Sequence, residues 1–300
     1  MRNDKLLNYL HLHFIIFIWG FTAVLGALIS LEAIPLVWYR MLVATLIIFA
    51  FLKFKKEKLN FSLKTLSGFA LGGVIIALHW LTFFGAIKAS NVSITLAVLS
   101  TGAFFASILE PLIYGRKVIL YEVLFGLVVV AGLYIIFDVE ASYTLGIVLA
   151  LISAFLSALF SVINGKFVLK HKASAISFYE LMFGVLGITI YLAFSGSFTA
   201  DFFKVSAYDW MYLLILASVC TAYAFIASVH VMKWISPYTV MLSINMEPVY
   251  GIFLALIILG DSENMSPQFY YGALIILVTV VANGIIKITQ ERKRRRLSNL

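Results

Sequence analysis

Charged residues are scarce in this chain of 300 residues: only 12% are Asp, Glu, Lys or Arg, while 63% are hydrophobic. A soluble globular domain carries roughly 25% charged and 45–50% apolar residues. So few polar side chains cannot cover a water-exposed surface of this size. The scarcity of charge therefore excludes an ordinary soluble domain and predicts that lipid surrounds most of the molecule.

Cysteine and the common metal and phosphate motifs are also scarce or missing. Cys220 is the only cysteine and lies inside an apolar run, so neither a disulfide framework nor a thiolate metal site is expected. The sequence contains no CxxC, HExxH or glycine-rich phosphate loop. We therefore expect no cofactor and no bound metal.

The net charge of +8 does not indicate nucleic-acid binding. The basic residues stand in short segments between apolar runs, and the densest cluster, Arg292 to Arg296, follows the last run. This placement suits a cytoplasmic membrane surface that carries anionic lipid. We expect the lipid bilayer, and no nucleic acid, as the partner of these charges.

Ten apolar runs are long enough to cross a bilayer, which takes about 20 residues in a helix. The breaks between them are short and polar, so consecutive spans are expected to be antiparallel. The first run is long and is followed by no clear A-x-A cleavage site, which favours a retained span over a signal peptide. The runs cover approximately residues 9–30, 35–54, 65–88, 91–114, 119–137, 144–165, 174–194, 208–232, 237–259 and 267–288.

The distribution of Lys and Arg predicts the direction of these spans. With a cytoplasmic N-terminus, 19 of the 22 basic residues fall on the cytoplasmic side, only Lys88 and Lys204 fall outside, and Arg40 lies within a span. The positive-inside rule assigns orientation from such a bias. We expect both termini in the cytoplasm, a basic cytoplasmic tail at 291–300, and insertion in the cell (inner) membrane.

The second half of the sequence resembles the first. "PLVWYRML" at 35–42 matches "AISFYELM" at 175–182, and "LIYG" at 112–115 matches "IILG" at 257–260. The offset stays near 140–146 residues. The pattern indicates an internal repeat.

Each repeat holds five spans, an odd number, so the second repeat must enter the membrane from the opposite side. The sequence thus predicts an all-α membrane protein of two inverted five-helix repeats, over residues 1–138 and 143–290. Inverted repeats are typical of secondary transporters, which expose one central site alternately to either face of the membrane.

Three segments carry a family resemblance: "FIWGFTAVLG" at 17–26, "PLVWYR" at 35–40 and "NMEPVYGIFLALIILGD" at 245–261. With them, essentially the whole chain resembles the EamA type of the drug/metabolite transporter superfamily. The resemblance implies export or uptake of small solutes such as amino acids or nucleotide precursors. Glu110-Pro111 and His79 depart from the usual pattern of that family.

Ionisable groups at bilayer depth cost about 2.5–3.5 kcal/mol each on insertion scales, so each of them needs a reason. Glu247 precedes Pro248 near the middle of the ninth span and lies close to Asn245. Its carboxyl is a candidate for substrate contact or proton transfer, or it ties the helix to a neighbour. Glu110 lies nearer the cytoplasmic end of the fourth span and is a candidate gate, substrate contact or structural pair.

Two further polar groups lie within spans. Arg40 either contacts the solute or snorkels to the outer surface. Its repeat counterpart, Glu180, lies at an equivalent depth on the other side, so direct pairing of the two is not expected. His79 either satisfies a buried hydrogen bond or takes part in proton coupling.

Aromatic and small side chains have two interpretations as well. Four aromatic residues inside spans either line a pocket or pack the bundle, and Trp80 lies beside His79, deep in its span. The four are Trp19, Tyr39, Tyr179 and Tyr223. Ser153, Ser157, Ser161 and Gly165 recur every fourth position, which favours close helix packing over solute contact.

These features together predict a secondary transporter, an exporter of small organic metabolites such as amino acids, that works by alternating access. Proton coupling through His79, Glu110 and Glu247 is a separate hypothesis. The alternatives are a lipid-linked sugar flippase, an intramembrane lipid-processing enzyme and a structural subunit. An enzyme is disfavoured because it needs clustered acid–base or metal-binding residues, and the sequence shows scattered ones. Monomer and homodimer are both open.

Overall fold

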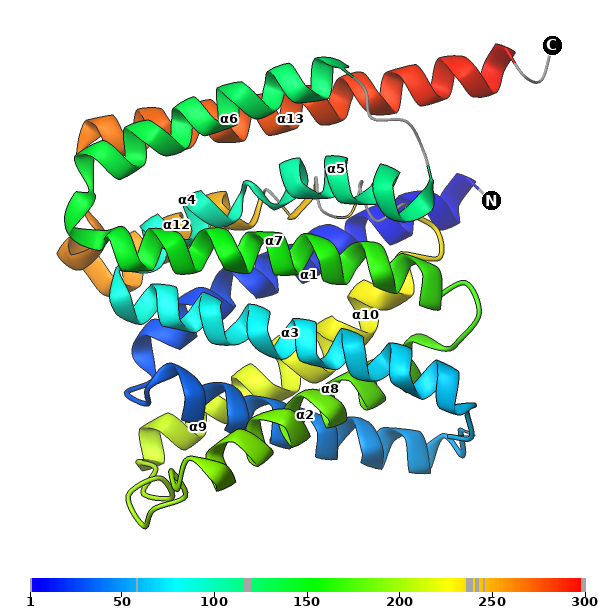
Figure 1. The fold of residues 1–300 in the computed structure, drawn as a ribbon, viewed down its shortest axis with the longest axis vertical. Helices are drawn as coiled ribbons and strands as arrows, with labels where there is room; N and C mark the ends of the chain where they lie inside the picture. Colours follow the sequence, from blue (N-terminus) through cyan, green and yellow to red (C-terminus); the bar gives the residue numbers. More distant parts are fainter. Residues whose placement is uncertain are drawn as a thin grey trace.

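The computed structural model describes residues 2–57, 59–115, 120–235, 240, 243–244 and 246–297. Throughout these residues the regular structure is helical, which confirms the predicted all-α class (Figure 1). The elements are α1 (Arg2–Leu28), α2 (Ala33–Phe54), α3 (Leu63–Ala89), α4 (Val92–Leu99), α5 (Gly102–Tyr114), α6 (Leu120–Val139), η1 (Ala141–Tyr143), α7 (Thr144–Phe167), α8 (Ala173–Phe194), α9 (Ala207–Ala217), η2 (Ser218–Tyr223), α10 (Ala224–Val231), α12 (Glu247–Leu259), η3 (Gly260–Glu263) and α13 (Pro267–Leu297).

Seven stretches of the described residues are long and apolar enough to cross a membrane. Two shorter apolar helices, Leu124–Asp138 and Pro267–Asn283, overlap the fifth and tenth predicted runs. Large apolar side chains also cover much of the outer surface; Phe253 is 65% exposed and Leu127 is 62% exposed. Such a surface is stable in lipid and unfavourable in water. The chain is therefore an integral, multi-pass membrane protein.

α2 and α8 have the same local structure although they begin 140 positions apart. Each is 22 residues long and follows an extended residue. The second residue after each helix has a positive φ, 51° at Lys56 and 65° at Gly196. In Figure 1 the two helices run in opposite directions.

The fourth and the eighth predicted spans are not continuous α-helices. The fourth run breaks at Ser100 and Thr101, whose hydroxyls donate to backbone carbonyls three residues earlier at 2.6 and 2.8 Å. The eighth run contains the π-helical segment η2, where the Thr221 hydroxyl donates to the carbonyl of Leu216 at 2.6 Å. Hydroxyl groups that bond within their own helix bend it, and π segments often mark functional sites.

Glycines allow several helix pairs to approach closely. α6 and α13 lie side by side along one edge of the molecule (Figure 1) and cross where Gly132 faces Gly272. A Cβ atom on either glycine would lie about 3.0–3.1 Å from the carbonyl oxygen of the other. These glycines are also 140 positions apart, so this crossing joins matching positions of the two halves.

Candidate functional site

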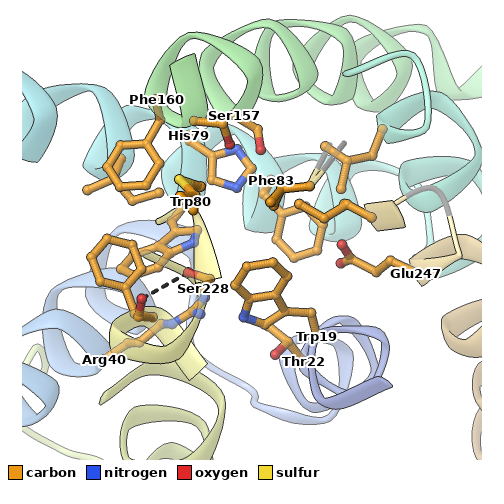
Figure 2. A pocket seen from close by; sticks show the side chains of 17 residues that line it. Trp19, Thr22, Arg40, His79, Trp80, Phe83, Ser157, Phe160, Ser228 and Glu247 are labelled. Carbon is orange, nitrogen blue, oxygen red and sulfur yellow. Dashed lines mark hydrogen bonds between the residues drawn. The ribbon is translucent and has the colours of Figure 1, made fainter. Parts of the chain in front are cut away.

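A cavity of about 70 Å³ lies between helices from both halves of the chain (Figure 2). This volume holds a few water molecules, each of which needs about 10–15 Å³. Apolar and aromatic side chains form most of its wall, and a few polar groups point into it. The lining residues are Trp19, Thr22, Arg40, Ile76, His79, Trp80, Phe83, Leu99, Ser157, Phe160, Ser161, Phe225, Ser228, Met232, Val240, Ile244 and Glu247.

Arg40 of α2 points into this cavity and not to the membrane surface. Its side chain is only 2% exposed, so the snorkelling interpretation is wrong. The Nε atom donates to the Thr221 hydroxyl at 2.6 Å, and the guanidinium carbon lies 3.9 Å from the centre of the Trp80 ring. The Nη1 atom has no hydrogen-bond partner. The guanidinium is thus held rigidly by its neighbours while one edge stays free for a ligand.

Glu247 comes from the other side of the cavity (Figure 2). It is the first residue of α12, and Pro248 follows it, so the proline starts this helix instead of interrupting one. The positive end of the helix dipole lies next to the carboxyl. In the described part of the chain no ion pair joins Glu247 to Arg40, although both face the same cavity.

His79 of α3 is fixed by the facing helix α7. Its Nδ1 atom lies 2.8 Å from the hydroxyl and 3.0 Å from the backbone carbonyl of Ser153. Because a carbonyl can only accept, a bond to it requires hydrogen on Nδ1. The ring is therefore held in one orientation at the cavity wall, as the buried hydrogen-bond interpretation predicts.

Aromatic rings line the cavity between the two charged side chains. In Figure 2, Trp19 and Phe83 lie between Arg40 and Glu247. Phe225 contacts Trp80 at a centroid distance of 5.7 Å and stacks on Phe160 at 5.3 Å. The arrangement suits a small ligand with charged ends and an apolar body.

The comparisons with known proteins agree with this architecture. The model of the EamA-like transporter family matches residues 9–138 and 144–284. The chain belongs to the EamA-like transporter family. It is therefore a membrane transporter of the drug/metabolite superfamily, a group of transporters and not of enzymes. The resemblance seen in the sequence is confirmed.

A solved structure shares the fold of this EamA-like chain. The crystal structure, described only as that of a "protein", superposes with a TM-score of 0.66 at 15% identity. The match covers 92% of this chain and 97% of the other. At this identity the likeness concerns the fold alone. A search of curated proteins found no significant match.

Several predicted site residues lie outside the cavity of this EamA-like protein. The Tyr39 hydroxyl donates to the carbonyl of Phe202 at 3.3 Å, and that of Tyr179 donates to the carbonyl of Leu59 at 2.7 Å. Tyr223 is 44% exposed and its hydroxyl lies 2.8 Å from Nε2 of His11. Of the four aromatic residues predicted to line a pocket or to pack, Trp19 alone is on this cavity.

Glu110 and Asn245 have different outcomes. Glu110 is buried in α5 and does not line the cavity. Asn245 lies outside the described residues. Among the small residues, Ser153 binds His79, while Ser157 and Ser161 line the cavity. That face of α7 therefore lines the cavity as well as packing against a neighbouring helix.

Several lining residues were not predicted from the sequence, although their spacing along α3 and α7 indicates some of them. Ile76, His79, Trp80 and Phe83 follow the i, i+3, i+4, i+7 spacing of one helix face. Ser157, Phe160 and Ser161 repeat that spacing on α7. Extending these faces from His79 and Ser157 would have predicted Phe83 and Phe160. Thr221 carries no such signal, because its contact with Arg40 depends on the π-helical segment.

Proposed function

We propose that this chain is a secondary transporter of ten spans in two inverted repeats, residues 1–138 and 143–290, with both termini in the cytoplasm. The equal lengths, similar ends and opposite directions of α2 and α8 support the repeat. The glycine pair at 132 and 272 supports it from a second position. The basic-residue bias supports the orientation in a cell (inner) membrane.

The transported solute is a small zwitterion such as an amino acid, and the direction is export. The single observation that carries this proposal is the placement of Arg40 and Glu247. Two ionisable groups that can carry opposite charges face one cavity without pairing with each other, in a setting where each would be costly as an unpaired charge. A ligand with a carboxylate for Arg40 and an ammonium group for Glu247 would remove both costs.

The position of the cavity supports alternating access. Its wall includes residues of α1, α2, α3 and α4 of the first half and of α7, α10 and α12 of the second. Movement of one half against the other would change its opening from one membrane face to the other. Since about 70 Å³ holds little more than a few waters, the halves must move apart to admit an amino acid.

A flux measurement in proteoliposomes tests the proposal. Liposomes that contain the full chain are loaded with an L-amino acid, and exchange of labelled L-leucine and L-phenylalanine is measured. Unlabelled amino acids should compete. Their amides, which lack the carboxylate, and their N-acetyl derivatives, which lack the ammonium group, should compete at least about tenfold more weakly, as expected when a buried polar group loses its partner.

Variants of two cavity residues test whether the cavity is responsible for the exchange. Arg40→Gln and Glu247→Gln should each reduce exchange at least about tenfold. Asp201→Asn changes an 85%-exposed carboxylate in a loop and serves as the control. The absence of exchange for a broad panel of amino acids with the unmodified protein would overturn the proposal. The direction of transport is tested in cells. Cells that express the chain should show a lower ratio of internal to external amino-acid concentration than cells without it.

A further inference from the structure

Glu180 of α8 is the most completely enclosed carboxyl among the described residues that the cavity does not use. Its side chain is 0% exposed. Oε1 accepts one hydrogen bond, from Asn164 Nδ2 of α7 at 2.9 Å, and Oε2 has no partner. The Asn164 Oδ1 and Ser177 Oγ atoms nearby in the fold are also buried without partners. From the sequence, Glu180 was named only as the repeat counterpart of Arg40.

The backbone of α3 closes over this carboxyl. A Cβ atom at Gly72 would overlap Oε1 of Glu180, and one at Gly73 would overlap its backbone oxygen. Only glycine at these two positions leaves room for the glutamate. The carboxyl is therefore sealed between α3, α7 and α8, where water does not solvate it.

No described cation neutralises Glu180. The charged and titratable groups on the helices packed against α8, and at its start, are engaged elsewhere or exposed. Arg40 binds Thr221, Lys53 lies over the Phe49 ring, His79 binds Ser153, Lys88 binds the carbonyl of Ile29, Lys166 binds the carbonyl of Ile113, the His171 ring packs against Phe61 and Phe69, Lys64, Lys170 and His230 are exposed, and Glu57 pairs with Lys172.

An ionised carboxylate in such a site is strongly unfavourable, because one neutral amide donor replaces its whole hydration shell. The neutral acid avoids the cost of a buried charge, which is the larger one. The sealed conformation therefore requires a proton on Glu180.

The repeat relationship indicates where this proton can go. Arg40 and Glu180 occupy matching positions in α2 and α8, yet Arg40 lines the cavity and Glu180 is sealed. In a transporter of two inverted repeats that differ in conformation, the site opens to the other membrane face when each repeat takes the conformation that the other had before. In that state Glu180 would face the pathway, as Arg40 does here. Asn164, the donor to Glu180, also donates from Nδ2 at 3.3 Å to the backbone carbonyl of Phe160, a residue of the cavity lining, so a single side chain connects the two places.

We propose that Glu180 is a proton-binding site of the transport cycle. It carries a proton while it is sealed between α3, α7 and α8, and it releases that proton to water as a carboxylate when it faces the pathway. The proposal rests on the transporter function argued above. The sealed conformation binds one more proton than the conformation in which Glu180 faces the pathway. A low pH therefore favours the sealed conformation, and a high pH favours the other.

Infrared spectroscopy of the full chain in lipid tests proton binding without any substrate. The unmodified protein at about pH 7 should show a C=O stretching band of a protonated, buried carboxyl group that Glu180→Gln lacks. Glu180→Asp should restore such a band at a shifted frequency. Glu57→Gln, which alters a carboxylate paired with Lys172, should leave the band unchanged. The same band in the unmodified protein and in Glu180→Gln would overturn the proposal.

A flux measurement tests separately whether transport is coupled to this proton. In proteoliposomes, amino-acid exchange by the unmodified protein should change several-fold between about pH 6 and about pH 8, and an imposed pH gradient should drive net uptake. Glu180→Gln mimics the protonated acid, so it should lose gradient-driven uptake and most of the pH dependence, and Glu180→Asp should keep both. Unchanged pH dependence in Glu180→Gln would refute the coupling. If the unmodified protein moves no amino acid, the proposed function fails, and the infrared result still decides the state of Glu180.

Discussion

Tyr39 and Tyr179, 140 positions apart, each donate a hydroxyl hydrogen bond to a backbone carbonyl in a loop of the other half of the chain. The Tyr39 bond reaches Phe202 in the α8–α9 connection, and the Tyr179 bond reaches Leu59 in the α2–α3 connection. The two loops lie at opposite ends of the bundle in Figure 1. Both tyrosines were predicted as pocket or packing residues, and the structure places them at the contacts between the halves.

Removal of either hydroxyl should loosen one end of the molecule. Tyr179→Phe should lower the free energy of unfolding by about 0.5–1.5 kcal/mol, the usual value of one hydrogen bond. It should speed amide hydrogen exchange around Leu59 and leave the loop at Phe202 unchanged. Tyr39→Phe should do the reverse, with a smaller effect because its bond is longer.

Tyr191→Phe is the matched control, because Tyr191 lies on the same helix as Tyr179 and is 58% exposed. It should change neither loop. Equal acceleration of exchange in both loops by a single variant would contradict the assignment of one contact to each end.

The sequence predicts the helical class, the family and several residues of the cavity. Arg40, His79, Trp80, Trp19 and Glu247 were all nominated and all line the cavity. Composition and hydropathy suffice for this level, because charged or aromatic groups at bilayer depth are few. What the sequence does not provide is the rotation of each helix about its axis.

The pair Tyr39 and Arg40 illustrates this limit. Consecutive residues of a helix point about 100° apart, and of these two neighbours only Arg40 lines the cavity. The apolar pattern of α2 is nearly uniform around the helix, because its other sides face lipid and protein that are equally apolar. Packing against α8 and η2 fixes the rotation, and that information is spread over the whole fold.

The contact between Arg40 and Thr221 predicts a second experiment. Thr221→Val keeps the shape of the side chain and removes the hydroxyl that accepts from Nε at 2.6 Å. The guanidinium then loses its fixed position and has a further buried, unpaired N–H group. We expect amino-acid exchange to weaken by about tenfold, equivalent to about 1–2 kcal/mol.

Thr82→Val is the control for Thr221→Val, because the Thr82 hydroxyl bonds only carbonyls of its own helix, at Leu78 and His79. Exchange should stay within about twofold of the unmodified protein, since such a bond adds little to positioning. Equal loss in both variants would indicate that hydroxyl removal acts through the fold and not through Arg40.

The crossing of α3 and α8 predicts a third experiment. A Cβ at Gly73 would lie 3.0 Å from the amide nitrogen of Gly184 and would overlap the carbonyl oxygen of Glu180. Both obstacles are backbone atoms, which cannot move aside independently. Gly73→Ala should therefore destabilise the protein by at least about 1–3 kcal/mol, the usual range for overpacking. Thermal unfolding in detergent measures this effect.

Gly187→Ala gives the opposite expectation on the same helix pair. A Cβ at Gly187 meets nothing within 4 Å, and alanine favours the helix by about 0.5–1 kcal/mol over glycine. The melting temperature should stay constant or rise. A fall of similar size in both variants would show that helix geometry, and not the close crossing, sets the cost.

The start of α4 predicts a fourth experiment, on a carboxylate whose surroundings differ from those of Glu180. Glu263 is only 2% exposed and accepts the backbone N–H groups of Val92 at 3.1 Å and Ser93 at 2.8 Å. The side chain thus occupies the N-terminus of α4 and accepts two of its backbone N–H groups. Glu263→Gln directs an NH₂ group at one of these donors, so we expect a loss of about 1–3 kcal/mol in unfolding free energy.

Asp261→Asn, at an exposed position of the same η3 segment, should have almost no effect. Because α4 supplies Leu99 to the cavity wall, Glu263→Gln should also reduce amino-acid exchange. A loss of stability with unchanged exchange would contradict the link between the start of α4 and the cavity.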